Sequence, residues 1–415
     1  MIGQLSEDVV AAVGVAGRAL FVAMILLSGI ATGGSMLMAQ YFGANDENGV
    51  RRTLAITWLV STIVAIIPAI GFGLFGQNIV GLSTESSVIR ELGHQYLAIT
   101  GVSLFFVAFN GAISAGLRSV RQAKLSAGLS AFGIICNLVL NAILIFGLLG
   151  VPALGLKGAA IATLVSCILE TVVTLLAIYK GEHILRLRRK CLRAVGQLSY
   201  FSHFITLALP TTFNFLLWAV GLFTYTTLMG QASTQGLVVL SVISPIEAFS
   251  LSFLTGIANA SAVIVGNHLG AKDQEQAYAQ AIGFVVLAIG VTIVVSVVLF
   301  MMRAPVLNLF GALSSDTREM AEHFYGILCF GIILRSLPTT MVVGVLRAGG
   351  DVKFCLYQDL ITQWLIGIPL VAIAVLYLGW SPTWVFALFF VEAVCKWFAC
   401  IRRFRTRLWL RTLTQ

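Results

Sequence analysis

Charged residues are scarce in this 415-residue chain: only 10% are Asp, Glu, Lys or Arg, whereas 59% are hydrophobic. With a mean hydropathy of +0.97, the chain has too few polar side chains to cover a soluble globule of this length. Apolar runs of about 20 residues or more recur along it, each able to cross a hydrocarbon core as a helix. The in-and-out alternation of barrel strands is absent. The composition therefore predicts an all-α, polytopic membrane protein.

Histidine and cysteine are also sparse. The five histidines stand singly, and the seven cysteines include no Cys-x-x-Cys spacing. Neither a metal centre nor a disulfide framework is therefore expected. The chain also lacks the His-Glu-x-x-His motif and the histidine runs of membrane metalloenzymes. We expect no enzyme activity and no cofactor.

Hydropathy predicts eleven membrane-spanning helices. Their expected ranges are 9–42, 53–75, 88–117, 125–147, 158–179, 203–228, 236–268, 277–301, 319–346, 354–378 and 382–401.

Two elements of the sequence occur twice in the same order and at nearly the same separation. The pattern Gly-Ile-Ala-x(11)-Gly-Ala-x-Asp occupies positions 29–46 and recurs at 256–273, and the Leu-Arg pair at 117–118 recurs at 346–347. Copies that run in the same order indicate two lobes related by a pseudo-two-fold axis along the membrane normal. We expect two six-helix lobes, at 1–180 and 200–415, joined by a basic linker at 181–199, with a central cavity between the lobes.

Alignment of the two copies leaves the helix at 203–228 without a counterpart, because that counterpart would precede residue 1. We expect that the sequence starts at an internal methionine and lacks the first helix of the first lobe. The loss of one helix of twelve in the natural protein is the alternative.

Basic residues predict the orientation. Alternate loops and the C-terminus, placed on one side, collect 19 of the 26 Lys and Arg residues, and that side is cytoplasmic by the positive-inside rule. The net charge of +9 then needs no nucleic-acid partner, although the same cations can contact anionic membrane lipid. We expect a multi-pass protein of the plasma membrane, the bacterial inner membrane, with a cytoplasmic C-terminus.

Each duplicated Gly-Ala-x-Asp element has a mechanical interpretation. Gly43 and Gly270 are expected to stop a long helix as C-caps, and Asp46 and Asp273 to cap the helix that follows.

Further motifs carry a family resemblance. The run from Asn141 to Gly147 leads into Pro-Ala-Leu-Gly at 152–155 and Gly-Ala-Ala-Ile-Ala-Thr at 158–163, and Leu-Arg-Ala-Gly-Gly-Asp occupies 346–351. With the duplicated elements, these resemble the multidrug and toxic compound extrusion (MATE) transporters over essentially the whole chain. The resemblance implies twelve helices in two lobes, and export of organic, often cationic, compounds in exchange for H⁺ or Na⁺.

Departures from the family leave its familiar coupling acids without counterparts here. The first-helix aspartate falls in the missing helix, and Pro210 is followed by Thr211-Thr212-Phe213-Asn214 rather than by a glutamate. A lipid-linked oligosaccharide flippase of the wider superfamily is an alternative function, and a non-transporting membrane scaffold or receptor is another. We expect a monomer with a small organic substrate.

Ionisable residues inside the predicted spans are candidates for ion coupling and gating, because each is costly in hydrocarbon unless paired or hydrated. These residues are Arg18, Glu170, Glu247, Arg335, Asp359, Glu392 and Lys396. The coupling-ion candidates among them are Asp359, Glu247, Glu392 and Glu170. Glu392 and Lys396 have the i, i+4 spacing of a helix ion pair. We expect this pair to be structural rather than to act in transport. Asp359 is either a carboxylate for H⁺ or Na⁺ or the partner of Arg335.

Arg18 and Glu247 form a candidate gate. The duplication maps Arg18 onto Pro245, two positions from Glu247, so the two charges lie at matching depth in matching helices. We hypothesise that they latch the extracellular side shut. The alternative is that each charge is satisfied within its own lobe.

Amides and aromatics complete the site prediction, since polar groups in apolar helices need partners and aromatic faces attract cations. The candidates for the substrate cavity are Asn110, Asn137, Asn141, Asn214, Trp218 and Gln363.

Overall fold

The computed structural model describes residues 6–150, 152–180, 183–187, 198–308 and 314–414. Within these ranges the chain is almost entirely helical and contains no strand. Eleven helical spans of the described chain are long and apolar enough to cross a membrane. The predicted all-α, eleven-helix membrane architecture is therefore confirmed.

Backbone contacts divide the chain into two compact units. The first unit is Met1–Phe42 with Asp46–Phe215, and the second is Gly43–Asn45 with Leu216–Gln415. The division falls between Phe215 and Leu216, inside the helix Leu198–Ala232. The linker expected at 181–199 lies mostly outside the described residues. The lobe boundaries inferred from the duplication stay a prediction.

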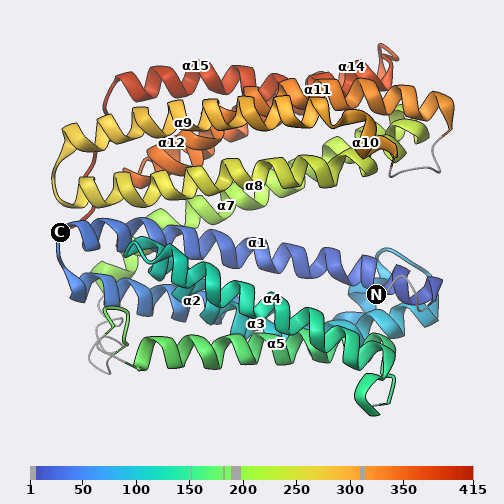
Figure 1. The fold of residues 1–415 in the computed structure, drawn as a ribbon, viewed down its shortest axis with the longest axis horizontal. Helices are drawn as coiled ribbons and strands as arrows, with labels where there is room; N and C mark the ends of the chain where they lie inside the picture. The colour runs from blue at the N-terminus through green and yellow to red at the C-terminus, as the bar shows by residue number, and fades with distance from the viewer. Residues whose placement is uncertain (1–5, 151, 181–182, 188–197, 309–313, 415) are drawn as a thin grey trace. The chain divides into compact units, whose positions relative to one another are not determined.

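The first unit is an arrangement of long helices in which α2 packs on α3 and α5 packs on both α3 and α4 (Figure 1). Its elements are α1 (Glu7–Gly43), α2 (Glu47–Gly81), α3 (Ser87–Ser119), α4 (Ala123–Phe146), the short 3₁₀ turn η2 (Leu148–Gly150), α5 (Gly155–Tyr179) and the first part of α7 (Leu198–Ala232). Apolar side chains such as Ala16, Leu27, Phe72 and Leu104 form a core on α1, α2 and α3.

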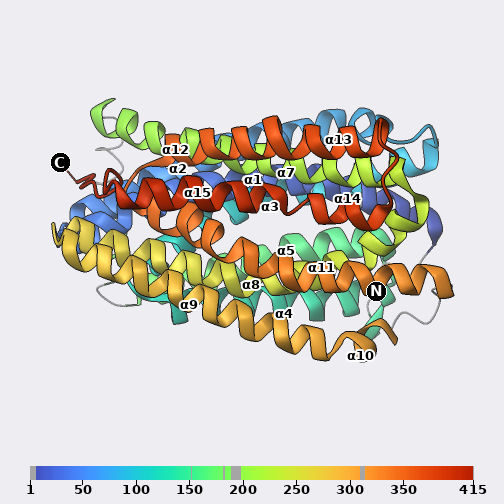
Figure 2. The ribbon, with the colours of Figure 1, turned by 90° about the horizontal axis from the view of Figure 1, so that it is seen from above.

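The second unit packs α8, α9 and α11 against one another, with α15 alongside α11 (Figure 1). Its elements are α8 (Thr234–Gly270), α9 (Gln274–Met301), α10 (Arg303–Asn308), α11 (Ser315–Thr339), the π-helix η3 (Thr340–Leu346), α12 (Val352–Asp359), the π-helix η4 (Leu360–Gly367), α13 (Ile368–Leu376), α14 (Pro382–Leu388) and α15 (Val391–Arg405). Figure 2 shows α12 and α13 as successive parts of one span, which η4 joins.

The turns after α1 and α8 have the same construction. The Asp46 side chain accepts a hydrogen bond from the Gly49 backbone N–H, and Asp273 accepts one from Gln276. These N-caps confirm the predicted roles of both aspartates. The predicted glycine C-caps are wrong in detail: Gly43 and Gly270 are the last helical residues, and the left-handed residues stand two positions later, where Asn45 has φ 57° and Lys272 has φ 63°.

The turns after α3 and η3 repeat the same backbone as well. Arg121 has φ 62°, and Gly350, at the matching position of the second copy, has φ 75°. The Gln122 N–H donates to the Leu117 carbonyl at 2.8 Å, and the Asp351 N–H donates to the Leu346 carbonyl at 3.0 Å. A left-handed conformation is unfavourable for residues other than glycine, so its recurrence at matching positions shows that the duplicated sequence keeps duplicated backbone geometry.

Candidate functional site

Five ionisable side chains of the second unit lie close together and are called the charge cluster here. They are Glu247 on α8, Arg335 on α11, Asp359 at the end of α12, and Glu392 and Lys396 on α15. All five are at least four-fifths shielded from solvent. Burial of charges is costly even when they are paired, so a buried ionic cluster indicates a function more strongly than it indicates stability.

Lys396 bridges two carboxylates. Its Nζ lies 2.9 Å from Asp359 Oδ1 and 3.8 Å from Glu392 Oε1. The predicted i, i+4 pair of Glu392 and Lys396 is therefore present, but the shorter contact crosses from α15 to α12. Sequence spacing found the neighbour on the same helix and missed the bridge, because a contact between helices depends on how each is rotated about its axis.

Arg335 forms an ion pair with Glu247, from α11 to α8. Its guanidinium carbon also lies 4.7 Å from the centre of the Phe390 ring, where a cation is attracted to the aromatic face. The structure thus pairs Arg335 with Glu247 and pairs Asp359 with Lys396, instead of joining Arg335 to Asp359 as one of the sequence alternatives proposed.

Tyr225 of α7 extends the cluster. Its hydroxyl donates to Glu392 Oε2 at 3.4 Å, and its ring lies 4.6 Å from that of Phe389. The hydroxyl stands so close to Gly367 that an added Cβ there would collide with it. Nothing local in the sequence signals that the hydroxyl of Tyr225 meets a carboxylate.

The π-helix η4 begins directly after Asp359. Such wide turns are rare and concentrate at functional sites. η4 carries Gln363, which is buried and whose two side-chain polar atoms have no hydrogen-bond partner among the described residues. An unsatisfied buried amide costs about 1 to 3 kcal/mol, which makes Gln363 a candidate for a contact with a bound molecule or water.

The first unit holds a neutral counterpart, called the amide seam here, between α3, α4 and α5. Asn137 Nδ2 donates to Thr163 Oγ1 at 3.4 Å and to Ser166 Oγ at 3.3 Å, and Asn141 Nδ2 donates to Asn137 Oδ1 at 2.9 Å. Further along, Asn110 Oδ1 accepts from Thr171 Oγ1 at 3.0 Å. The structure thus brings together three of the predicted cavity amides within one unit.

Glu170 is the acid nearest to this seam. It is half-buried on α5, and Asn110 is a hydrogen-bond partner of its side chain. Its carboxylate also lies against Gly133 of α4, where an added Cβ would meet Oε2 at 2.6 Å. One carboxylate therefore lies beside the neutral seam, with an amide as its partner.

The remaining candidates are dispersed. Arg18 is exposed on α1, Trp218 is 40% exposed on α7, and Asn214 is buried. The structure holds Glu247 in its pair with Arg335, and the latch between Arg18 and Glu247 stays a prediction.

Comparison with known proteins supplies the family. The MatE family model matches residues 1–143 and 210–373. The uncharacterized transporter YisQ of Bacillus subtilis is 24% identical over 99% of this chain and 90% of its own length. A probable multidrug resistance protein NorM of Bradyrhizobium diazoefficiens is 29% identical over 91% of this chain and 82% of its own length. A crystal structure of MATE in complex with MaL6 matches the fold with a TM-score of 0.89 at 17% identity, covering 98% of this chain and 90% of that one. Because the family model covers well over half of the sequence, this chain belongs to the MatE family of membrane transporters.

Proposed function

We propose that the protein exports organic compounds, chiefly cations, in exchange for protons, by alternating access of the two lobes. Membership of the MatE family supports transport, and several relatives are named as probable multidrug resistance proteins. The observation that carries the coupling proposal is the position of Lys396, whose ammonium group lies between Asp359 and Glu392.

Lys396 favours a proton over Na⁺ as the coupling ion. Its ammonium group already holds the place that a metal cation would take between the two carboxylates. Na⁺ would have to displace this group into a region where an unpaired ammonium is costly. A proton needs only one carboxylate oxygen and leaves the lysine where it is.

Glu392 is the proposed proton acceptor. Lys396 holds it at 3.8 Å, against 2.9 Å for Asp359, so Glu392 loses less attraction on neutralisation. Tyr225 Oη stands 3.4 Å from Glu392 Oε2, where the pair can share a hydrogen bond in either protonation state. Asp359 then keeps Lys396 in place.

Protonation changes the charge that a cationic substrate meets. Besides Glu392, the cluster contains the cations Arg335 and Lys396 and the carboxylates of Glu247 and Asp359, and Arg347 at the end of η3 interacts electrostatically with Asp359. Neutral Glu392 raises the total charge of the five-residue charge cluster from −1 to zero and so removes the attraction for a bound cation. Ionised Glu392 attracts it, which is the alternation that an H⁺/cation antiporter requires.

Gln363 is the proposed polar contact for the transported compound in the second unit, because its buried amide has unused donors and an unused acceptor. Asn110, Asn137 and Asn141 are proposed as a neutral polar wall in the first unit. The plasma-membrane location in bacteria, the cytoplasmic C-terminus and the monomeric state complete the proposal.

Proteoliposomes test this function. Vesicles that contain the purified protein and trapped ethidium are given either a pH gradient or a Na⁺ gradient, and ethidium fluorescence follows the flux. We expect the pH gradient to drive transport and the Na⁺ gradient alone to drive none. Glu392→Gln, which keeps this position neutral at every pH, should abolish pH-driven flux and weaken ethidium binding.

Glu319→Gln is the matched control, since Glu319 is an exposed glutamate at the start of α11 and lies outside the charge cluster. It should leave transport unchanged. Flux that follows Na⁺ instead of pH would contradict the coupling proposal, and the absence of gradient-driven flux for every organic cation tried would contradict export.

A further inference from the structure

Helix α15 has two chemically different faces. Glu392, Lys396 and Cys400 recur every four residues on a buried stripe that faces the charge cluster and the core of the second unit. Val394 and Phe398 stand on another side of the helix, where Phe398 is 74% exposed. That side points away from the packed core and, in a membrane, toward lipid.

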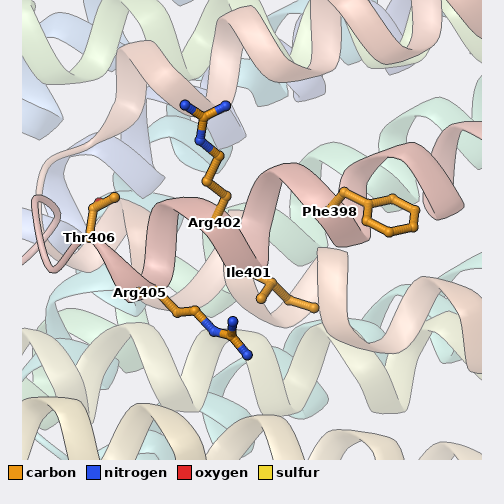
Figure 3. A pocket seen from close by; sticks show the side chains of 5 residues that line it. All are labelled: Phe398, Ile401, Arg402, Arg405 and Thr406. Carbon is orange, nitrogen blue, oxygen red and sulfur yellow. The ribbon is translucent and has the colours of Figure 1, made fainter.

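A pocket opens on this outer side at the end of the helix and is called the outer pocket here. Its lining residues are Phe398, Ile401, Arg402, Arg405 and Thr406. Figure 3 shows Arg402 and Arg405 projecting from opposite flanks of α15, with Ile401 and then Phe398 farther from the helix end. From Phe398 to Arg405 the helix rises about 10 Å, so the pocket changes from apolar to cationic over that length.

The two pocket arginines differ from their neighbours in sequence. Arg403 forms a two-bond ion pair with Asp351, at 2.5 and 2.9 Å, and Arg407 pairs with Glu275 at 2.7 Å. Arg402 and Arg405 are exposed and have no acidic partner among the described residues. Two positive charges at the end of an apolar helix face are therefore available to a counter-charge from outside the chain.

We propose that the outer pocket binds an anionic phospholipid of the surrounding bilayer. The headgroup phosphate pairs with the guanidinium group of Arg402 or Arg405 at the cationic end of the pocket, and an acyl chain runs along Ile401 and Phe398. The order of apolar and charged groups along α15 is the order of acyl chain and phosphate along a lipid. A soluble anion uses only the arginines and leaves Phe398 without a partner, and a zwitterionic lipid leaves the two positive charges uncompensated.

Native mass spectrometry of the detergent-solubilised full chain, titrated with phosphatidylglycerol, tests the proposal. The double variant Arg402→Gln/Arg405→Gln should bind the lipid about 30-fold more weakly, at roughly five-fold for each arginine near an anionic headgroup. Phe398→Ser should weaken phosphatidylglycerol but leave the binding of inorganic phosphate unchanged. Phosphatidylcholine should bind the unaltered protein no better than it binds the double variant.

The control variant Lys272→Gln/Lys353→Gln removes the same two charges from exposed positions outside the pocket and should bind phosphatidylglycerol normally. Equal affinity of the pocket variant and this control would overturn the proposal. So would displacement of the lipid by inorganic phosphate at equal concentration, because the site would then recognise a free anion. Thermal unfolding of each variant verifies that the fold persists.

Discussion

The amide seam of the first unit and the charge cluster of the second unit occupy related places in the duplicated chain. When the Leu-Arg element at 117–118 is aligned with its copy at 346–347, Asp359 corresponds to Ser130, Glu392 to Thr163, and Lys396 to Cys167. Every member of the lysine-bridged triad thus has a neutral counterpart. One of these counterparts, Thr163, accepts a hydrogen bond in the amide seam.

This difference separates what the duplicated fold supplies from what the second copy adds. Both copies keep the same turn geometry, with left-handed residues at matching positions. Neutral amides and hydroxyls satisfy one another without changing charge, whereas carboxylates around an ammonium group can take up a proton. The comparison therefore supports our proposal that proton coupling lies in the second unit, whereas the amides and hydroxyls of the seam make polar contacts without titrating.

Removal of the lysine should produce the largest effect. Lys396→Met leaves Asp359 and Glu392 buried without their shared cation, and breaking a buried ion pair from one side typically costs about 3 to 5 kcal/mol. We expect the free energy of unfolding in detergent to fall by about that amount and transport to stop. Chemical denaturation and ethidium flux measure the two effects.

The triple variant Asp359→Asn/Glu392→Gln/Lys396→Met makes the second unit resemble the first. It should recover most of the stability lost in Lys396→Met, since no uncompensated charge remains, and should still fail to transport. Recovery of pH-driven transport would show that the cluster is structural and would remove the contrast between the units.

The fold could be predicted further than the site. Long apolar runs defined the eleven spans because hydrocarbon imposes both length and composition on a helix. The duplication located the turns, although it predicted Gly43 and Gly270 as the C-caps, whereas the left-handed residues that follow the two helices are Asn45 and Lys272. The left-handed conformation of the residue before each capping aspartate therefore depends on the backbone of the whole turn, and the identity of a single residue does not predict it.

The site required the structure. The sequence indicated that Asp359 and Lys396 are costly in a membrane, but their contact depends on the relative rotation of α12 and α15. The π-helical segments η3 and η4 have no local signal, because a single wide turn leaves hydropathy unchanged. A π-helical turn changes the side of the helix on which residues such as Gln363 lie. A projection that assumes a regular α-helix therefore places these residues on the wrong side.

The pair of Arg335 and Glu247 gives the next prediction. Both side chains are a little less than one-fifth exposed, so their coupling should be intermediate between a surface pair and a buried one. In a double-mutant cycle with Arg335→Gln and Glu247→Gln, we expect a coupling energy of about 1 to 2 kcal/mol in the free energy of unfolding.

The same cycle, read out as transport, distinguishes this pair from the latch hypothesis. If Glu247 acts only through Arg335, the double variant should transport better than either single variant. If Arg18 is its functional partner, Arg18→Gln should instead reproduce the transport defect of Glu247→Gln.

Asn137→Leu applies the comparable change to the amide seam. It removes the hydrogen bonds to Thr163, Ser166 and Asn141, all between neutral groups, so we expect a loss of about 1 to 2 kcal/mol in stability. The affinity for transported cations should fall, while the pH dependence of transport keeps its midpoint. A shifted midpoint would place part of the coupling in the first unit.

The segments that follow the last helix of each copy extend the comparison to the membrane surface. His183 Nδ1 accepts from the Leu185 N–H at 3.1 Å, so its Nε2 is the donor to Gln122 Oε1 at 2.6 Å and the ring is neutral. The matching position in the second copy is Thr412, whose hydroxyl donates to the Leu269 carbonyl at 3.2 Å and does not titrate near neutral pH. Of these two hydrogen-bonding side chains, His183 can therefore gain a proton near neutral pH and Thr412 cannot.

Burial lowers the pKa of His183 below its ordinary value of about 6.5. As the pH falls below about 6.5, the unfolded chain therefore binds more protons at His183 than the folded chain does. The contribution of His183 to the free energy of unfolding is complete above that pH and is lost as the pH falls through the lower pKa of the folded state. Hydrogen exchange at 183–187, corrected for intrinsic rates, should accelerate at acid pH, whereas exchange at 409–413 should not. His183→Gln should abolish the acid-dependent change. Equal acceleration of exchange in both segments would contradict this prediction, because the hydrogen bonds of His183 can be lost on protonation whereas that of Thr412 cannot.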